Sequence, residues 1–154
     1  IWNIVFTGFF VVLVTMGAII LETEARIPLS ELTIVDYLLI TLATWRLTRL
    51  VVYDVVTKWF REQFYDAVKD EEGRLVLVKP KTGPRRTLAD LVSCPWCFGV
   101  WAAAFIVFCY LITDYAVYPV MLLAVAAVAT FLQLLSNLVG HHAEATKLKN
   151  ERGF

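Results

Sequence analysis

The chain has 154 residues, of which 59% are apolar and 18% are charged, and its mean hydropathy is +0.67. Because soluble domains are about 45–50% apolar and about 25% charged, this composition excludes a disordered chain. The 14 basic and 14 acidic residues cancel, so we expect no nucleic-acid partner. The apolar residues gather into blocks, which indicates an all-α, polytopic membrane protein in contact with the lipid bilayer.

The first block, residues 1–21, contains no charged residue. At about 1.5 Å per residue it spans about 30 Å, the thickness of the hydrocarbon core of a bilayer. A signal peptide is the alternative, but the block lacks a basic N-terminal region and an A-x-A-like cleavage site. The second block, residues 32–53, contains Asp36, Arg46 and Arg49 and is also predicted to span the membrane.

The third and fourth blocks cover residues 95–113 and 119–138, and each has a proline in its first helical turn. Proline is tolerated there because its missing N–H would have no partner within the helix. The connection over residues 113–118 is long enough only for a tight turn, so the two blocks predict a transmembrane hairpin. We therefore predict four transmembrane helices in a single membrane domain, residues 1–154.

Basic residues concentrate in the loop over residues 54–94 and in the tail over residues 139–154. Short basic loops of membrane proteins lie in the cytoplasm. Since an even number of spans puts both ends of the chain on one side, we predict a multi-pass protein of the cell membrane with cytoplasmic N- and C-termini. Glu22, Glu24 and Glu31 are then expected outside.

Within the loop, residues 54–70 carry apolar side chains at helical spacing and charges on the opposite side, which predicts an amphipathic helix. This helix either lies in the headgroup plane, with the rings of Trp59, Phe60 and Phe64 directed into the membrane, or packs on the protein itself. The next stretch, residues 74–79, favours a β-strand.

The basic segment KPKTGPRR contains Lys79, Lys81, Arg85 and Arg86. Anionic lipid is one predicted partner, because each basic residue near a membrane surface contributes about 1 kcal/mol. The alternative is that the run only follows the positive-inside bias.

The sequence CPWC, from Cys94 to Cys97, stands where the third block begins. Two cysteines at a helix N-terminus lie near the positive end of the helix dipole, which lowers the pKa of a thiol. The motif is typical of dithiol redox chemistry, of half a zinc site, or of a structural start of a helix. A stable disulfide is disfavoured on the predicted cytoplasmic side, which is reducing.

A structural zinc ion takes four ligands. Cys109 lies about 18 Å further along the predicted helix and is too far from the motif. His141 and His142 follow the fourth block on the same predicted side, so one conceivable set is Cys94, Cys97, His141 and His142. A second possible arrangement is an all-thiolate site to which two chains each contribute a cysteine pair. The alternative without zinc is that the two histidines are simply polar residues at a helix end.

Arg46 and Arg49 lie three apart in the second block and share a helix face. Arginine inside an apolar span is costly and is by default a functional-site hypothesis. Both side chains can extend to the cytoplasmic interface, or one of them can pair with Asp54 or Asp90 and clamp the loop to the bundle. We favour the clamp.

Small residues at Gly99 and Ala103 have the spacing that lets membrane helices approach closely. Gln133 and Asn137 lie four apart on the last predicted helix and can hydrogen-bond to a neighbouring helix. These residues either hold the hairpin together, which we favour, or recruit another membrane subunit or a second copy of the chain.

The runs ATWRLTRLVVYD (residues 43–54) and LVSCPWCFGVW (residues 91–101) resemble DUF1360, a bacterial and phage family of small membrane proteins, some of which carry a sporulation label. The resemblance covers roughly residues 35–138 and implies a membrane location. It also implies a family signature, which here consists of Arg46, Arg49, Asp54, Cys94, Cys97, Gly99 and Trp101.

The sequence contains no Ser/His/Asp constellation, Walker loop or GxGxxG motif. We therefore expect a non-enzymatic accessory or scaffold subunit of a membrane complex or homo-oligomer, without a cofactor. The alternatives are a membrane-anchored thiol–disulfide redox protein that uses the CPWC pair, and a membrane protein stabilised by zinc.

Overall fold

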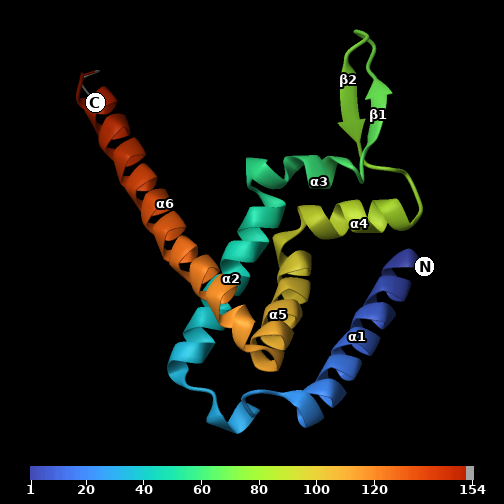
Figure 1. Ribbon diagram of the computed structural model, residues 1–154. Coiled ribbons are helices and arrows are strands. Elements are labelled where there is room, and N and C mark those ends of the chain that lie inside the picture. Colours follow the sequence, from blue (N-terminus) through green and yellow to red (C-terminus); the bar gives the residue numbers. More distant parts are fainter. Residues whose placement is uncertain (152–154) are drawn as a thin grey trace.

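Figure 1 shows the computed structural model, which describes residues 1–151; the last part of the predicted tail, residues 152–154, lies outside the described residues. Four long helices dominate the structure, and a two-stranded antiparallel sheet lies in the loop between the second and the third. The elements in chain order are α1 (Trp2–Glu24), η1 (Leu29–Glu31), α2 (Ile34–Val52), η2 (Val55–Thr57), α3 (Lys58–Glu62), β1 (Asp66–Lys69), β2 (Leu75–Val78), α4 (Pro84–Ser93), α5 (Pro95–Ile112), η3 (Asp114–Ala116) and α6 (Val117–Glu151).

Three of the long helices, α1, α5 and α6, are long and apolar enough to cross a membrane. Helix α2 has 19 residues and includes three charged side chains, those of Asp36, Arg46 and Arg49. The protein is thus mostly helical, and its three apolar helices indicate a membrane protein.

Helix α2 lies at the centre of the bundle, with α5 on one side and α6 on the other (Figure 1). Small residues let α2 pack closely against its neighbours. Ala43 of α2 is fully buried, and Gly99 of α5 faces Thr48 of α2. The two helices of the predicted hairpin, α5 and α6, meet mainly near their turn. Gly99 therefore serves the contact between α5 and α2 rather than the hairpin.

One end of the bundle, here called the turn end, contains the α1–α2 connection and the α5–α6 turn (Figure 1). Arg26 forms an ion pair with Asp114 at 3.0 Å, and its guanidinium donates to the carbonyl oxygen of Tyr110 at 3.2 Å. The Tyr110 hydroxyl donates to Asp36 at 2.5 Å, and Asp36 also closes a capping box with Thr33. These polar contacts join α1, α2 and α5 at the turn end.

The opposite end, here called the loop end, contains α3, the β-hairpin and α4, and the N-terminus lies beside α4 (Figure 1). The predicted amphipathic helix over residues 54–70 is wrong, since the helical part ends at Glu62 and β1 begins at Asp66. Asp70 accepts hydrogen bonds from the backbone of Glu72 and Arg74 at 3.0 and 2.9 Å. This turn closes the hairpin, and the pairing of β1 with β2 replaces the helix.

The amphipathic helix of the loop is instead α4, which begins with Pro84 at its first turn. Its buried residues are Ala89 and Val92, whereas Arg85 and Arg86 in its first turn are exposed. Helix α4 leads directly into α5 at Cys94, so the two helices form a sharp corner at the loop end (Figure 1).

The turn-end network predicts the effect of a single-atom deletion. Tyr110→Phe removes the hydroxyl that donates to Asp36, and Tyr110 is 3% exposed. A hydrogen bond to a charged group contributes about 1.5–3 kcal/mol, so the free energy of unfolding in detergent falls by about that amount. The control is Tyr118→Phe, because Tyr118 is 70% exposed. Equal stability of the two variants would contradict a structural role for this network.

Candidate functional site

The loop end holds an ion pair between α2 and the segment that follows it. Arg46 Nη1 lies 2.8 Å from Asp54 Oδ2, and the two side chains are 17% and 28% exposed. Asp54 follows the last turn of α2 and begins η2, so the pair bridges the point where the chain leaves the helix. Of the four pairs considered from the sequence, this is the one that the structure contains.

Two further side chains bind the carbonyl end of α2. Arg61 Nη1 donates to the carbonyl oxygens of Val51 and Asp54 at 2.7 and 2.9 Å, and to Thr57 Oγ1 at 2.9 Å. The Thr57 hydroxyl donates to the carbonyl oxygen of Leu50. These contacts satisfy carbonyl groups that have no partner within the helix. Sequence reasoning missed both residues, since their roles require the chain to turn back over the end of α2.

Arg49 has a different environment from Arg46. Its guanidinium lies over the rings of Trp45 and Tyr53, with its central carbon 5.5 and 5.3 Å from their centroids. Such cation–π contacts offset part of the cost of removing the charge from water. Among the described residues, the buried Nε of Arg49 has no hydrogen-bond partner. The two arginines therefore do not form a single clamp.

The CPWC motif occupies the corner between α4 and α5. Cys94 is both the C-cap of α4 and the N-cap of α5, and its sulfur accepts the backbone N–H of Cys97 at 3.3 Å. The Cys97 side chain is the main hydrogen-bonding group that lowers the pKa of the Cys94 thiol below its usual range, followed by the Cys97 backbone. Cys94 is half-buried and Cys97 is exposed.

Lys79 reaches the same corner from the loop. Its Nζ lies 2.8 Å from Asp90 Oδ1 and 2.9 Å from Ser93 Oγ, and the hydrogen bond to Asp90 raises the pKa of Lys79. The loop that follows β2 is thereby tied to the last turn of α4. Asp90, considered from the sequence as a partner of the α2 arginines, is engaged by this lysine instead.

A family model described as "Protein of unknown function (DUF1360)" matches residues 39–136, a segment that contains both the Arg46–Asp54 pair and the CPWC motif. The chain belongs to the DUF1360 family.

The chain is also similar to two individual proteins of Bacillus subtilis (strain 168). It is 37% identical to sporulation protein YjcA over 112 residues, which cover 70% of this chain and 92% of YjcA. It is 30% identical to UPF0713 protein YngL over 108 residues, which cover 68% of this chain and 81% of YngL. No solved structure matches the chain.

This DUF1360 protein does not gather the four zinc ligands considered from the sequence. Within residues 1–151, no three His, Cys, Asp or Glu side chains lie close enough together to hold a metal ion. Helix α6 continues past the predicted end of the fourth block, and His141 and His142 are exposed on it. The C-terminal half of α6 points away from α5 (Figure 1). A site formed by cysteine pairs from two chains stays a prediction.

The basic segment of the loop makes several internal ion pairs. Arg85 pairs with Asp66 at 2.9 Å and so ties the β-hairpin to α4, and Arg86 lies 3.8 Å from Asp90. Because these charges and Lys79 already have acidic partners, fewer are available to anionic lipid than the sequence suggests. The interaction of Lys79, Lys81, Arg85 and Arg86 with lipid stays a prediction.

The three aromatic residues predicted to enter the membrane interface contact one another around α3. The ring centroids of Trp59 and Phe60 are 6.0 Å apart, and those of Phe60 and Phe64 are 5.3 Å apart. This edge-to-face cluster lies at the loop end, and its contact with lipid stays a prediction.

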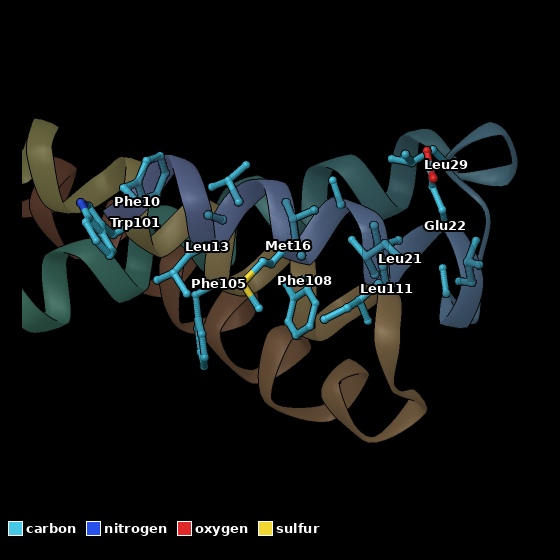
Figure 2. A pocket seen from close by; sticks show the side chains of 18 of the residues that line it. Phe10, Leu13, Met16, Leu21, Glu22, Leu29, Trp101, Phe105, Phe108 and Leu111 are labelled. Atoms are coloured by element: carbon cyan, nitrogen blue, oxygen red, sulfur yellow. The ribbon is translucent and has the colours of Figure 1, made fainter. Parts of the chain in front are cut away.

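An apolar cleft of about 760 Å³ separates α1 from α5 (Figure 2). Phe10 packs against Trp101 near one end, with the two rings tilted and their centroids 4.7 Å apart, while Leu21 and Leu111 line the other end. Its volume is that of a pocket for an apolar chain, but converging polar groups typical of a catalytic pocket are few, with Glu22 the one charged residue among the described lining residues. The cleft was not predictable from the sequence, because it depends on the angle between the two helices.

The Arg46–Asp54 pair predicts a stability effect. Arg46→Leu leaves a half-buried carboxylate without its partner, and we expect a loss of about 1–3 kcal/mol in the free energy of unfolding, less than the 3–5 kcal/mol typical of fully buried pairs. The measurement is a double-mutant cycle with Asp54→Asn in detergent. The effects of the two substitutions on the free energy of unfolding should be non-additive by at least about 0.5 kcal/mol. Simple additivity would contradict a stabilising interaction between Arg46 and Asp54.

Proposed function

We propose that this chain is a four-span protein of the cell membrane, with its termini and its loop in the cytoplasm, that acts as a non-enzymatic accessory or scaffold subunit. The position of the N-terminus supports the number of spans. The Thr87 hydroxyl of α4 donates to Asn3 Oδ1 at 2.9 Å, so α1 begins at the loop end. Helix α2 ends there as well, and a chain that leaves and returns to the same end crosses twice (Figure 1).

The charges of α2 are compatible with a membrane-spanning role for this helix, in addition to α1, α5 and α6. Asp36 lies in the first turn and is bound by Tyr110, while Arg46 is paired and Arg49 lies over two rings. Ionisable groups are tolerated within membranes when they face protein partners or lie near a helix end. The basic loop at the loop end supports the cytoplasmic assignment of that side.

The observation that carries the scaffold role is the unpartnered half of α6. This helix packs on α2 through Val120, Ala124 and Ala127, and all of residues 131–148 are exposed. On this part, Gln133 Nε2 donates to Asn137 Oδ1 at 3.1 Å. One such bond leaves other donors and acceptors of the two amides unpaired, and in lipid these groups favour association with another helix.

The partner of α6 is another membrane subunit or a second copy of the chain. Because one relative is a sporulation protein, the membranes of a sporulating cell are the first biological setting in which to look for it.

The proposed topology is tested by labelling with a membrane-impermeant maleimide, in a chain whose three native cysteines are replaced by serine. Thr23→Cys, at the turn end, should be labelled on intact cells. Thr82→Cys, in the loop, should be labelled only after lysis. Both positions are exposed, so access to the reagent depends on the side of the membrane. Labelling of Thr23→Cys only after lysis would overturn the topology.

The proposed association is tested on α6. Gln133→Leu combined with Asn137→Leu removes the amides and should weaken the complex by about 3- to 30-fold, since interhelical hydrogen bonds contribute about 0.6–2 kcal/mol. The measurement is crosslinking in membranes and co-purification in mild detergent, with mass analysis of the crosslinked species. The control, Leu132→Val with Leu135→Val, alters exposed apolar residues of the same stretch and should leave association unchanged. A wild-type chain that remains a lone monomer under crosslinking would contradict the scaffold role.

A further inference from the structure

We propose that Cys94 and Cys97 form a thiol–disulfide exchange site, in which Cys94 is the attacking thiolate and Cys97 is the resolving thiol. The proposal goes beyond the scaffold role and does not depend on it. It rests on the geometry of the α4–α5 corner, on the groups that surround the two sulfurs, and on their access to solvent.

The geometry directs Cys94 toward the free N–H groups of α5. As the N-cap residue, Cys94 takes the position from which a side chain accepts the first unpaired N–H groups of a helix. Pro95 has no N–H, and the backbone N–H of Cys97 donates to the Cys94 sulfur at 3.3 Å. A thiolate at this position is stabilised both by the hydrogen bond and by the positive end of an 18-residue helix.

The groups around Cys94 also favour its thiolate form. Hydrogen bonds from the Cys97 side chain and backbone are the largest causes of the lowered pKa of Cys94, and the positive charge of Lys79 adds to them. Lys79 is held at the corner by Asp90 and Ser93, at 2.8 and 2.9 Å. A lowered pKa places more of Cys94 in the reactive thiolate form at neutral pH.

The two thiols are accessible to solvent, and the third cysteine of the chain, Cys109, serves as a comparison. Cys97 is exposed, Cys94 is half-buried, and Trp96 between them is 86% exposed. Cys109 lies within α5, where it is half-buried among apolar side chains away from the helix N-terminus. A disulfide substrate can therefore reach the corner from the aqueous side, next to the flat surface of the Trp96 ring.

The reaction balances as an exchange with a small or protein disulfide. The Cys94 thiolate attacks one sulfur of the substrate, forms a mixed disulfide and releases the other sulfur as a thiolate, which takes up a proton. Cys97 loses its proton to solvent and attacks the Cys94 sulfur, which forms the Cys94–Cys97 disulfide and releases the second thiol. Two electrons pass from the dithiol to the substrate disulfide, whose two halves leave as thiols.

The experiment uses the full-length protein in detergent, with oxidised glutathione as the disulfide. The wild-type chain should lose two alkylatable thiols while Cys109 remains free. Cys97→Ser should accumulate glutathione on Cys94, because the resolving thiol is missing. Cys94→Ser should react at least about tenfold more slowly, as only an ordinary thiol remains. Failure of Cys97→Ser to form the mixed disulfide would overturn the proposal.

Alkylation rates provide a second readout. With iodoacetamide, the rate at Cys94 should reach half its maximum below about pH 8.5, the ordinary pKa of a cysteine, and should exceed the rate at Cys109 at pH 7. Equal rates at the two residues would overturn the proposal. Protection of both thiols that is released by a chelator would also overturn it, since the pair would then be half of a zinc site. None of these outcomes affects the topology, which is measured in a chain without cysteines, or the association of α6, which is tested at Gln133 and Asn137.

Discussion

Helix α2 lies between α5 and α6 while carrying a carboxylate in its first turn and two guanidinium groups toward its last. In a mostly apolar bundle each of these charges needs a partner. The partners of Asp36 and Arg46 come from other elements, whereas Arg49 lies over Trp45 of α2 itself and over Tyr53 at its end. Tyr110 of α5 binds the carboxylate, Asp54 from the loop binds Arg46, and two rings cover Arg49. The compensation of charge on one helix therefore ties the turn end and the loop end to the same central element.

The packing around α2 separates an inner unit from a peripheral helix. Small residues such as Ala43 and Ala127 are fully buried where α2 meets its neighbours, whereas α1 has no buried residue and an apolar cleft lies between it and α5. The DUF1360 model begins within α2 and ends within α6, at residues 39–136. The family match thus covers most of the inner unit, whereas α1 lies outside the matched residues.

Long helices were predictable from the sequence because runs of apolar residues mark them: residues 32–53 became Ile34–Val52, and residues 95–113 became Pro95–Ile112. In the loop, the β-prone stretch 74–79 did contain strand β2, at Leu75–Val78. The helix over residues 54–70 was wrong, because residues 66–69 pair with β2 across the turn at Asp70 despite their helical spacing. The same limit applies to the site. An ion pair between Arg46 and Asp54 was among those predicted from the sequence. The capping role of Arg61 was not predicted, because it depends on how the chain folds back over α2.

The cysteine corner illustrates how a structural and a chemical role coexist in one residue. Cys94 ends α4 through its backbone N–H, which donates to the carbonyl oxygen of Leu91, and caps α5 through its sulfur, which accepts the backbone N–H of Cys97. Five residues further on, Gly99 packs on Thr48, which lies between the two arginines of α2. The start of α5 is therefore anchored to the charged part of α2 as well as to α4. Because the Cys94 sulfur also accepts the backbone N–H of Cys97, the two thiols of the proposed exchange site lie within one turn of a helix start that is held on both sides.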